Sequence, residues 1–385
     1  MTGYERIKKI INHEEADKVP KYDSFWEDTL INYYSDGLDL SRDINLKTLN
    51  LGNISRNIGN PVNDHFGFDI DILYLDNSMR WKTRIHEETD EYIVITDRCG
   101  YTAKKLKNKS NTMLFMEHVN KTKDDWEKLK KRFFLDINDE ARIDSEPFFL
   151  KVDQSPSWNQ MKLIYDEFRK RNNFILFNGY GPYEGTWRHH GFTESLMDIA
   201  LEKNYMQDMF ETITDLTIEI LQYAIGCGMK PDGFYMVEDL GYKNSTLFSP
   251  ELYKEVLWPF HRKLGDFLQS NNIRFFIHSC GKIDTLLPYF IEAGIDVVQP
   301  LQANTGMNVI HLKEQYNNYL TFWGNINVIK LSGSYEDIEE EIKTKITKAM
   351  KGGGYIYHSD HSVPPSVSLD KYNYAMKMLD KYGRY

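Results

Sequence analysis

Residues 274–299 read RFFIHSCGKIDTLLPYFIEAGIDVVQ. They begin with an apolar run at Phe275–His278, which is typical of a buried parallel strand. A helix is predicted over Ile283–Ala293, and Gly294 stands where helices commonly end. A second short apolar run, Asp296–Gln299, predicts another strand. This stretch is therefore one strand, one helix and a second strand, the repeating unit of a parallel α/β fold.

The same alternation repeats from about residue 174 to the C-terminus. Strands joined by helices in this way run parallel, with right-handed crossovers. Two earlier segments, Lys18–Phe25 and Asp69–Tyr74, raise the strand count to eight, which predicts a (β/α)8 TIM barrel of the α/β class. A doubly wound open sheet is the alternative, but its usual Gly-rich phosphate loop is missing from this sequence. The six C-terminal strands are expected at Phe174–Asn178, Gly233–Glu238, Phe275–His278, Asp296–Gln299, Leu320–Trp323 and Tyr355–His358.

The N-terminal third departs from this alternation. Arg84–Thr96 and Gly100–Leu106 are rich in Thr, Ile, Tyr and Val and alternate like strands, so they predict a β-hairpin outside the repeating unit. Residues 27–50 are expected to be helical in part. We therefore expect a single barrel domain over residues 1–385, with a β-hairpin excursion in its N-terminal third and an irregular insertion at about 77–150.

Composition limits the possible partners and location. The net charge of −10 argues against a nucleic-acid surface. No apolar run approaches the roughly 18 residues of a transmembrane helix, and the N-terminus lacks the apolar core of a signal peptide. The three cysteines, Cys99, Cys227 and Cys280, are widely spaced and odd in number, so a disulfide framework is not expected. These features predict a cytoplasmic protein that binds neither nucleic acid nor membrane.

Polar residues follow most of the predicted strands, where a barrel places its catalytic groups. His278 and Cys280 are two positions apart along one strand, so their side chains project to the same side. An imidazole nitrogen and a thiolate sulfur placed in this way suit zinc. On spacing alone, a buried cysteine beside an unrelated histidine is the other interpretation. The strand ends carry Asp23, Asp76, Asn178, Glu238 with Asp239, His278 with Cys280, Gln299, Asn325, and the stretch His358-Ser-Asp-His361.

The third metal ligand is expected in the stretch His358-Ser-Asp-His361, and the residues alone leave His358 and His361 as alternatives. Three protein ligands with an open fourth position form the usual catalytic zinc arrangement. Glu238 is predicted to fill the fourth position or to act as a base. The ring-rich stretch Trp187-Arg-His-His190 either lines the barrel mouth or is an ordinary packed loop.

Several motifs together resemble the uroporphyrinogen decarboxylase superfamily, and more closely its cobalamin-dependent methyltransferase branch. That branch includes methylcobamide:coenzyme M methyltransferases and the methyltransferases of O-demethylase systems. The resemblance implies a (β/α)8 barrel and a zinc-dependent transfer of a methyl group between a corrinoid protein and a small-molecule donor or thiol acceptor. The motifs are Phe276-Ile-His-Ser-Cys-Gly281, Asp296-Val-Val-Gln-Pro300, Ser249-Pro-Glu-Leu-Tyr253 and Phe322-Trp-Gly-Asn-Ile326.

The resemblance also implies a ligand set. In the coenzyme M enzymes the third zinc ligand is a cysteine in the loop after the last strand, and aligning that loop on Ser362-Val-Pro-Pro365 places His361 there. The implied Zn²⁺ ligands are His278, Cys280 and His361, with Asp360 expected to hydrogen-bond a ligating imidazole. Cobalamin is expected on a separate corrinoid protein, because this chain has no room for a cobalamin domain.

Two alternatives remain from the sequence. One is a metal-free decarboxylase of porphyrinogen type, in which Asp76 would stabilise a developing pyrrole cation. Decarboxylases of this family begin with an Arg-rich segment, whereas Val19–Trp26 contains one Lys and no Arg. The other alternative is a non-catalytic barrel that binds a corrinoid partner. Only the methyltransferase requires about one zinc per chain.

Overall fold

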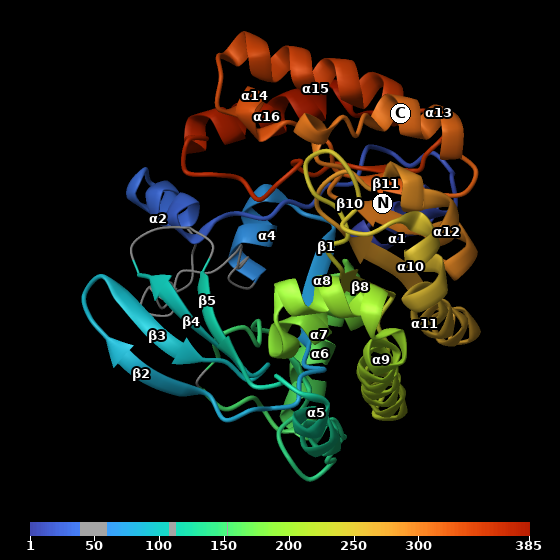
Figure 1. Cartoon of the computed structure of the whole chain (residues 1–385). Coiled ribbons are helices and arrows are strands. Elements are labelled where there is room, and N and C mark those ends of the chain that lie inside the picture. The colour runs from blue at the N-terminus through green and yellow to red at the C-terminus, as the bar shows by residue number, and fades with distance from the viewer. Residues whose placement is uncertain (39–59, 108–112, 152) are drawn as a thin grey trace.

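The structure, a computed structural model, describes residues 1–38, 60–107, 113–151 and 153–385. Within these residues one eight-stranded sheet has the order β12-β11-β10-β9-β8-β7-β1-β6 (Figure 1). Seven of its strands run parallel, and β6 runs antiparallel to β1. The strands are β1 (Ile70–Leu75), β6 (Ile143–Asp144), β7 (Phe174–Tyr180), β8 (Gly233–Val237), β9 (Arg274–His278), β10 (Val297–Gln299), β11 (Thr321–Trp323) and β12 (Tyr355–Ile356).

The N-terminal segment that was expected to form the first strand closes this sheet into a barrel. Tyr22 N donates to Tyr357 O at 3.2 Å, and Tyr357 N donates to Pro20 O at 2.8 Å, which joins the segment to the end of β12. On its other side Asp69 N donates to Lys21 O at 2.9 Å, just before β1. The segment forms isolated bridges rather than a ladder: those of Lys21 and Phe25 to the region of β12 are parallel, and that of Lys18 to Arg384 is antiparallel. Eight parallel segments thus surround one core, and the predicted (β/α)8 barrel is confirmed.

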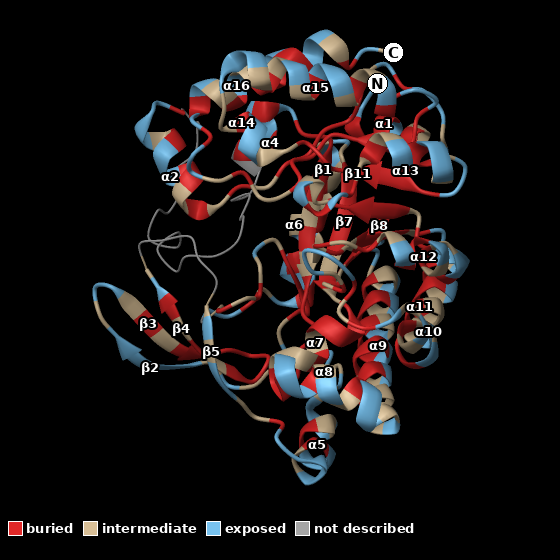
Figure 2. Cartoon of the chain, turned by 45° about the horizontal axis from the view of Figure 1, so that its top comes forward, coloured by how far each residue is buried: buried red, intermediate tan, exposed pale blue. Residues whose placement is uncertain are grey.

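Helices surround the barrel strands and turn their exposed faces outward, while the barrel strands between them are mostly buried (Figure 2). No helix in the described parts of the chain is long and apolar enough to span a lipid bilayer. Of the helical content expected at 27–50, α2 is present, and residues 39–50 lie outside the described part. The helices are α1 (Gly3–Ile11), α2 (Glu27–Ser35), α4 (Asn60–Phe66), α5 (Lys123–Leu129), α6 (Trp158–Lys170), α7 (Pro182–His190), α8 (Phe192–Leu201), α9 (Lys203–Gly226), α10 (Pro250–Val256), α11 (Trp258–Ser270), α12 (Leu287–Ala293), α13 (Val309–Tyr316), α14 (Val328–Leu331), α15 (Tyr335–Ala349) and α16 (Leu369–Tyr382).

A separate antiparallel sheet lies beside the barrel (Figure 1). The predicted hairpin is part of it, but the sheet has four strands in the order β2-β3-β4-β5. The segment predicted at Arg84–Thr96 forms two strands, β2 and β3, rather than one. The sequence pattern did not predict β5, which is mostly exposed and lacks the alternation of a half-buried strand. Its strands are β2 (Arg84–Glu88), β3 (Tyr92–Thr96), β4 (Tyr101–Leu106) and β5 (Leu114–His118).

The turn between β3 and β4 is fixed against the barrel mouth. The buried Asp97 carboxylate accepts hydrogen bonds from Cys99 N at 2.8 Å and from Leu150 N at 2.7 Å. Asn77, just after β1, donates to Tyr180 O at the end of β7 at 2.7 Å. These contacts bring the insertion, β1 and β7 together, so that residues far apart in the chain form one wall of the central cavity.

Candidate metal centre

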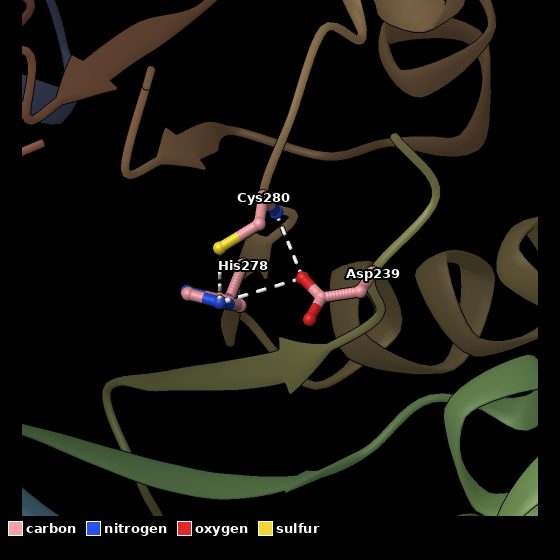
Figure 3. A group of neighbouring side chains, drawn as sticks. All are labelled: Asp239, His278 and Cys280. Carbon is pink, nitrogen blue, oxygen red and sulfur yellow. Dashed lines mark hydrogen bonds and ion pairs between the residues drawn. The ribbon is translucent and has the colours of Figure 1, made fainter. Parts of the chain in front are cut away.

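Three metal-binding side chains converge at neighbouring strand ends. Asp239 follows β8, His278 ends β9, and Cys280 lies two residues further on (Figure 3). Within the described residues they form the one group of three such donors whose ligand atoms all lie within 4.8 Å of one another. His278 Nε2 is 3.5 Å from Cys280 Sγ and 3.5 Å from Asp239 Oδ1. The structure thus brings His278 and Cys280 together as expected and adds a carboxylate.

The backbone beside Cys280 holds this geometry. Gly281 has a φ of +82°, and a Cβ there would lie 2.4 Å from the carbonyl carbon of Gly241. Only glycine fits this close approach of two backbone segments. Asp239 Oδ1 accepts a hydrogen bond from Cys280 N at 2.8 Å. This hydrogen bond to the main chain of Cys280 keeps the Asp239 carboxylate close to the Cys280 thiol.

Gln299 and Tyr235 orient the His278 ring through its second nitrogen, Nδ1. Its Nδ1 contacts Gln299 Oε1 and lies 3.2 Å from the hydroxyl of Tyr235, which donates to the same Gln299 oxygen at 2.5 Å. Because an amide oxygen only accepts, Nδ1 is assigned as the ring donor, and Nε2 keeps its lone pair toward Cys280 and Asp239. Metal-binding histidines usually make this kind of contact through their second nitrogen.

The charges of this group favour a cation. Burial raises the pKa of the Cys280 thiol well above its ordinary value, and the carboxylates of Asp239 and Glu184 raise it further. Without a metal the thiol is therefore protonated at neutral pH. A divalent ion would offset the repulsion between thiolate and carboxylate and displace that proton. Nitrogen, sulfur and oxygen donors in one group of three fit zinc with a fourth position left open.

Two of the three candidate donors, Asp239 and His278, border a cavity of about 270 Å³ in the barrel mouth. This volume is slightly below the usual range for ligand sites, about 300–1,000 Å³. Asp239 and His278 line it, together with Asp76, Gln299 and His358. Aromatic rings form a large part of its apolar wall, which includes Tyr22, Tyr74, Phe148, Phe149, Tyr180 and Tyr235. The cavity therefore suits a small molecule with an apolar body.

The two candidate histidines of the last loop differ in their surroundings. His361 stacks on Trp26, with ring centroids 5.7 Å apart and an interplanar angle of 18°, and it is not part of the three-donor group. Burial lowers its pKa, and so does the nearby His278. His358 lines the cavity, and burial lowers its pKa to about 3. The assignment of His361 as a zinc ligand stays a prediction.

Asp360 does not orient a histidine. Its two carboxylate oxygens accept hydrogen bonds from the backbone nitrogens of Ala303 and Val328, both at 3.0 Å. The expectation that Asp360 hydrogen-bonds a ligating imidazole is therefore wrong. The carboxylate instead ties the last loop to the loops after β10 and β11.

Glu238 faces away from the cavity. Its fully buried carboxylate accepts hydrogen bonds from Tyr183 N at 3.0 Å, Glu184 N at 2.8 Å and His261 Nε2 at 3.0 Å. A Cβ at Gly181, the residue before α7, would lie 2.3 Å from this carboxylate. Glu238 thus sits against the N-terminus of α7, where a negative charge is stabilised by unpaired backbone N–H groups. The structure assigns it to the start of α7 rather than to the metal donors or to a base in the cavity.

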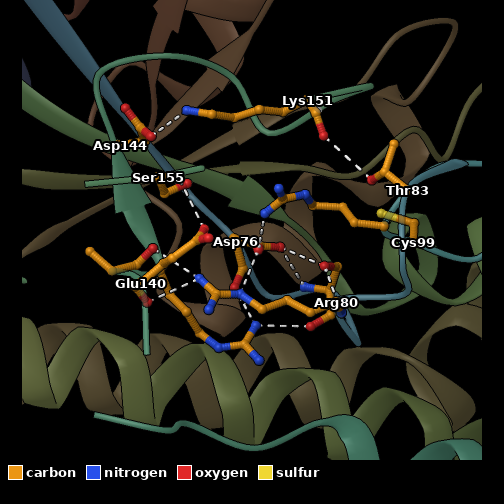
Figure 4. Close-up of polar contacts among 12 residues, drawn as sticks. Asp76, Arg80, Thr83, Cys99, Glu140, Asp144, Lys151 and Ser155 are labelled. Atoms are coloured by element: carbon orange, nitrogen blue, oxygen red, sulfur yellow. Dashed lines mark hydrogen bonds and ion pairs between the residues drawn. The ribbon is translucent and has the colours of Figure 1, made fainter. Parts of the chain in front are cut away.

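Asp76 lines the cavity but is surrounded by arginines (Figure 4). Its Oδ2 lies 2.8 Å from Arg98 Nη1 and 3.1 Å from Arg80 Nε, and Ser78 Oγ donates to Oδ1 at 2.6 Å. Burial alone would raise its pKa, but the guanidinium groups of Arg98, Arg142 and Arg80 lower it below the ordinary value. The carboxylate is therefore ionised, and its charge is already matched by cations.

Three charged residues of the cavity wall, Asp239, Arg98 and Arg188, were not assigned a binding role from the sequence. Asp239 was noted at a strand end but not as a ligand. Arg98 comes from the insertion and Arg188 from the last turn of α7, and both line the cavity. The ring-rich stretch Trp187–His190 did signal the second arginine, because the structure places that stretch in α7 beside the mouth. No local pattern pointed to Arg98.

Comparison with known proteins gives a family and a fold. The model of the family described as uroporphyrinogen decarboxylase (URO-D) matches residues 184–382, more than half of the chain. A search of curated proteins found no match. Among solved structures, a methyltransferase from Methanosarcina mazei matches with a TM-score of 0.61 and 13% identity over 99% of each chain. A structure of dispersin B has a TM-score of 0.34 and 12% identity, over 60% of this chain and 78% of that one.

Proposed function

The chain belongs to the uroporphyrinogen decarboxylase family, and on this premise we propose that it is a zinc-dependent methyltransferase. It would move a methyl group between a corrinoid protein and a small-molecule donor or thiol acceptor. The observation that carries the proposal is the convergence of Asp239, His278 and Cys280 at the edge of the cavity. The structural neighbour from Methanosarcina mazei is itself called a methyltransferase, which supports the same conclusion.

His278 and Cys280 are the proposed zinc ligands, and Asp239 is the third by position. Zinc held there supplies a Lewis acid that can lower the pKa of a bound thiol or polarise a methyl–oxygen bond. Gln299 and Tyr235 contact Nδ1 of His278, which leaves Nε2 facing Cys280 and Asp239 as the nitrogen that would bind the metal. A substrate that packs against the aromatic part of the wall would displace water from the space beside these ligands, which would strengthen electrostatic interactions there.

The geometry disfavours the porphyrinogen decarboxylase alternative. A carboxylate that stabilises a developing pyrrole cation must offer uncompensated negative charge. Asp76 is instead paired with Arg98 and Arg80. A cavity of about 270 Å³ is also small for a tetrapyrrole. The same limit implies that a corrinoid approaches from outside the cavity, carried by its own protein.

The reaction needs a reduced thiol at Cys280. All three cysteines, Cys99, Cys227 and Cys280, are free. A reducing compartment keeps such thiols available for metal binding. We therefore propose that the enzyme works in the cytoplasm, where its corrinoid partner would also reside.

Zinc content per chain tests the proposal. We expect about one zinc in the wild type, almost none in Cys280→Ala, and an unchanged value in Cys227→Ala. Cys227 is a matched control because it is also a free cysteine but ends α9 and does not line the cavity. A wild-type protein that binds no zinc under reducing conditions would rule the methyltransferase out and leave a non-catalytic barrel.

A second pair of variants identifies the third ligand. Asp239→Asn is expected to lower the zinc affinity by at least about tenfold, because the carboxylate is then replaced by a weaker ligand. His361→Ala is expected to keep stoichiometric zinc, since its ring packs on Trp26. The opposite pattern would support the loop alignment made from the sequence and would exclude Asp239.

A further inference from the structure

Two arginines in the cavity wall have N–H donors without an acceptor among the described residues. Arg98 lies in the turn between β3 and β4, and Arg188 in the last turn of α7; each side chain is 11% exposed. Among the described residues Arg98 donates only to Asp76, at 2.8 Å, and Arg188 only to Glu184, at 2.6 Å. A guanidinium carries five N–H donors. Most of the donors of both groups, including both buried Nε–H groups, therefore lack an acceptor in the described structure.

The oxygens of the neighbouring carboxylates already accept hydrogen bonds from other donors. Asp76 Oδ1 accepts from Ser78, and Glu184 Oε2 accepts from Trp187 Nε1 at 2.9 Å. The carboxylate of Asp97 is held by the backbone nitrogens of Cys99 and Leu150. Buried polar groups in proteins are almost always paired. The missing acceptor is therefore expected to come from a ligand.

Aromatic rings frame the two guanidinium groups. Arg98 lies 5.0 Å from the ring centroid of Phe148, and Arg188 lies 5.8 Å from that of Phe149 and 4.1 Å from that of Tyr180. Because Phe148 and Phe149 are consecutive, the two arginines approach adjacent rings of one segment. All these residues line the same cavity as Asp239 and His278.

We infer that Arg98 and Arg188 bind an oxyanion group, a carboxylate or a sulfonate, on the small molecule that occupies this cavity. Guanidinium forks match the geometry of such groups. The rings of Phe148, Phe149 and Tyr180 contact the apolar body of the same molecule. The inference rests on the proposed function for the reactive end of the substrate, which would face Asp239, His278 and Cys280. The anion subsite itself does not need the metal.

Paired probes test the subsite without any variant. Binding is measured by calorimetry for 4-methoxybenzoate against 4-methoxybenzamide, and for 3-mercaptopropionate against 3-mercaptopropionamide. The first pair represents a methyl donor and the second a thiol acceptor. We expect the acid of at least one pair to bind about tenfold or more tightly than its amide, with or without zinc. Absence of this preference in both pairs, including absence of binding, overturns the inference.

Variants of the two arginines test whether they cause the preference for the acid over the amide. Arg98→Gln and Arg188→Gln should each remove most of the preference for the acid, while the affinity for the amide changes little. Arg188→Lys keeps the positive charge but loses the forked guanidinium group. It should therefore keep more of the preference for the acid than Arg188→Gln does. Arg132→Gln is the matched control, because it makes the same change in net charge at an exposed arginine outside the cavity.

Two further results separate the possible failures. An equal loss for acid and amide, in variants that melt like the wild type, would mean that the arginines only support the cavity, and it would overturn the inference. Zinc content measured on the same samples tests the proposed function independently. A wild type that binds no zinc but prefers the acid refutes the metal enzyme and leaves the anion subsite in place.

Discussion

The substitution Glu238→Gln separates a structural role for this residue from a role at the metal. In the wild type the carboxylate accepts three hydrogen bonds, from Tyr183 N, Glu184 N and His261 Nε2, at 2.8–3.0 Å. A glutamine of the same shape has one oxygen, so its NH₂ group must face at least one of these donors. An unmet buried donor costs about 1–3 kcal/mol.

The lost charge adds to this cost. A negative charge in a partly buried position at a helix N-terminus contributes up to about 2 kcal/mol. We therefore expect the free energy of unfolding to fall by about 3 kcal/mol in Glu238→Gln, while zinc content stays near one per chain. The change is large because Glu238 is fully buried and no water can replace the missing acceptor.

Urea unfolding followed by circular dichroism measures the first quantity, and metal analysis of the folded protein measures the second. Glu251→Gln is the matched control, since Glu251 also lies in the first turn of a helix, α10, but is exposed. It should change stability far less. If Glu238→Gln loses its zinc and keeps its stability, the carboxylate binds metal in solution and the assignment to α7 is wrong.

Two further predictions concern protons. Because burial raises the pKa of Cys280, zinc binding at pH 7 should release about one proton per chain. Calorimetry in buffers of different ionisation enthalpy measures this number. The control variant Cys227→Ala should release the same number of protons, and a value near zero in the wild type would contradict a thiolate ligand. Burial raises the pKa of Asp23 from 3.8 to about 7, so the folded state holds its proton more tightly than the unfolded chain. The contribution of Asp23 is then most favourable below pH 4 and is lost as the pH rises toward 7, at roughly 1.4 kcal/mol per pH unit. Relative to the wild type, Asp23→Asn should therefore gain stability between pH 5 and 7 in urea titrations, and parallel curves would contradict this.

The barrel can be predicted from the sequence because its buried strands consist mostly of apolar residues. Strands that are covered on both sides read as apolar runs, and Phe276 and Ile277 of β9 are fully buried. The first strand was also located, although it forms only isolated bridges around Tyr22. The mostly exposed strand β5 shows no such apolar pattern, and the exposed β2 was not separated from β3. Their pairing depends on partners along the insertion, which a local pattern cannot show.

The assignment of Glu238 shows the limit for the site. Side chains alternate along a strand, so adjacent residues point to opposite sides. Tyr235, Val237 and Asp239 line the cavity, whereas Glu238 points to α7 and His261. The sequence places both carboxylates at the end of the strand, but the choice between them requires knowing which face is inside. In the structure Val237 pairs with His278 across β8 and β9, and both side chains line the cavity. Asp239 lies two residues after Val237 and therefore points to the same side.

Asp76 connects the two ends of the proposed substrate site in a way that its position alone did not suggest. The barrel strands supply the metal donors, while the insertion and α7 supply the arginines. Arg98 comes from the insertion, and its one hydrogen bond within the described structure is to Asp76 at the end of β1. The carboxylate therefore positions a cation instead of stabilising one on a substrate. If the proposed site is correct, the insertion can change to select another anionic substrate while the proposed zinc ligands at the ends of β8 and β9 remain unchanged.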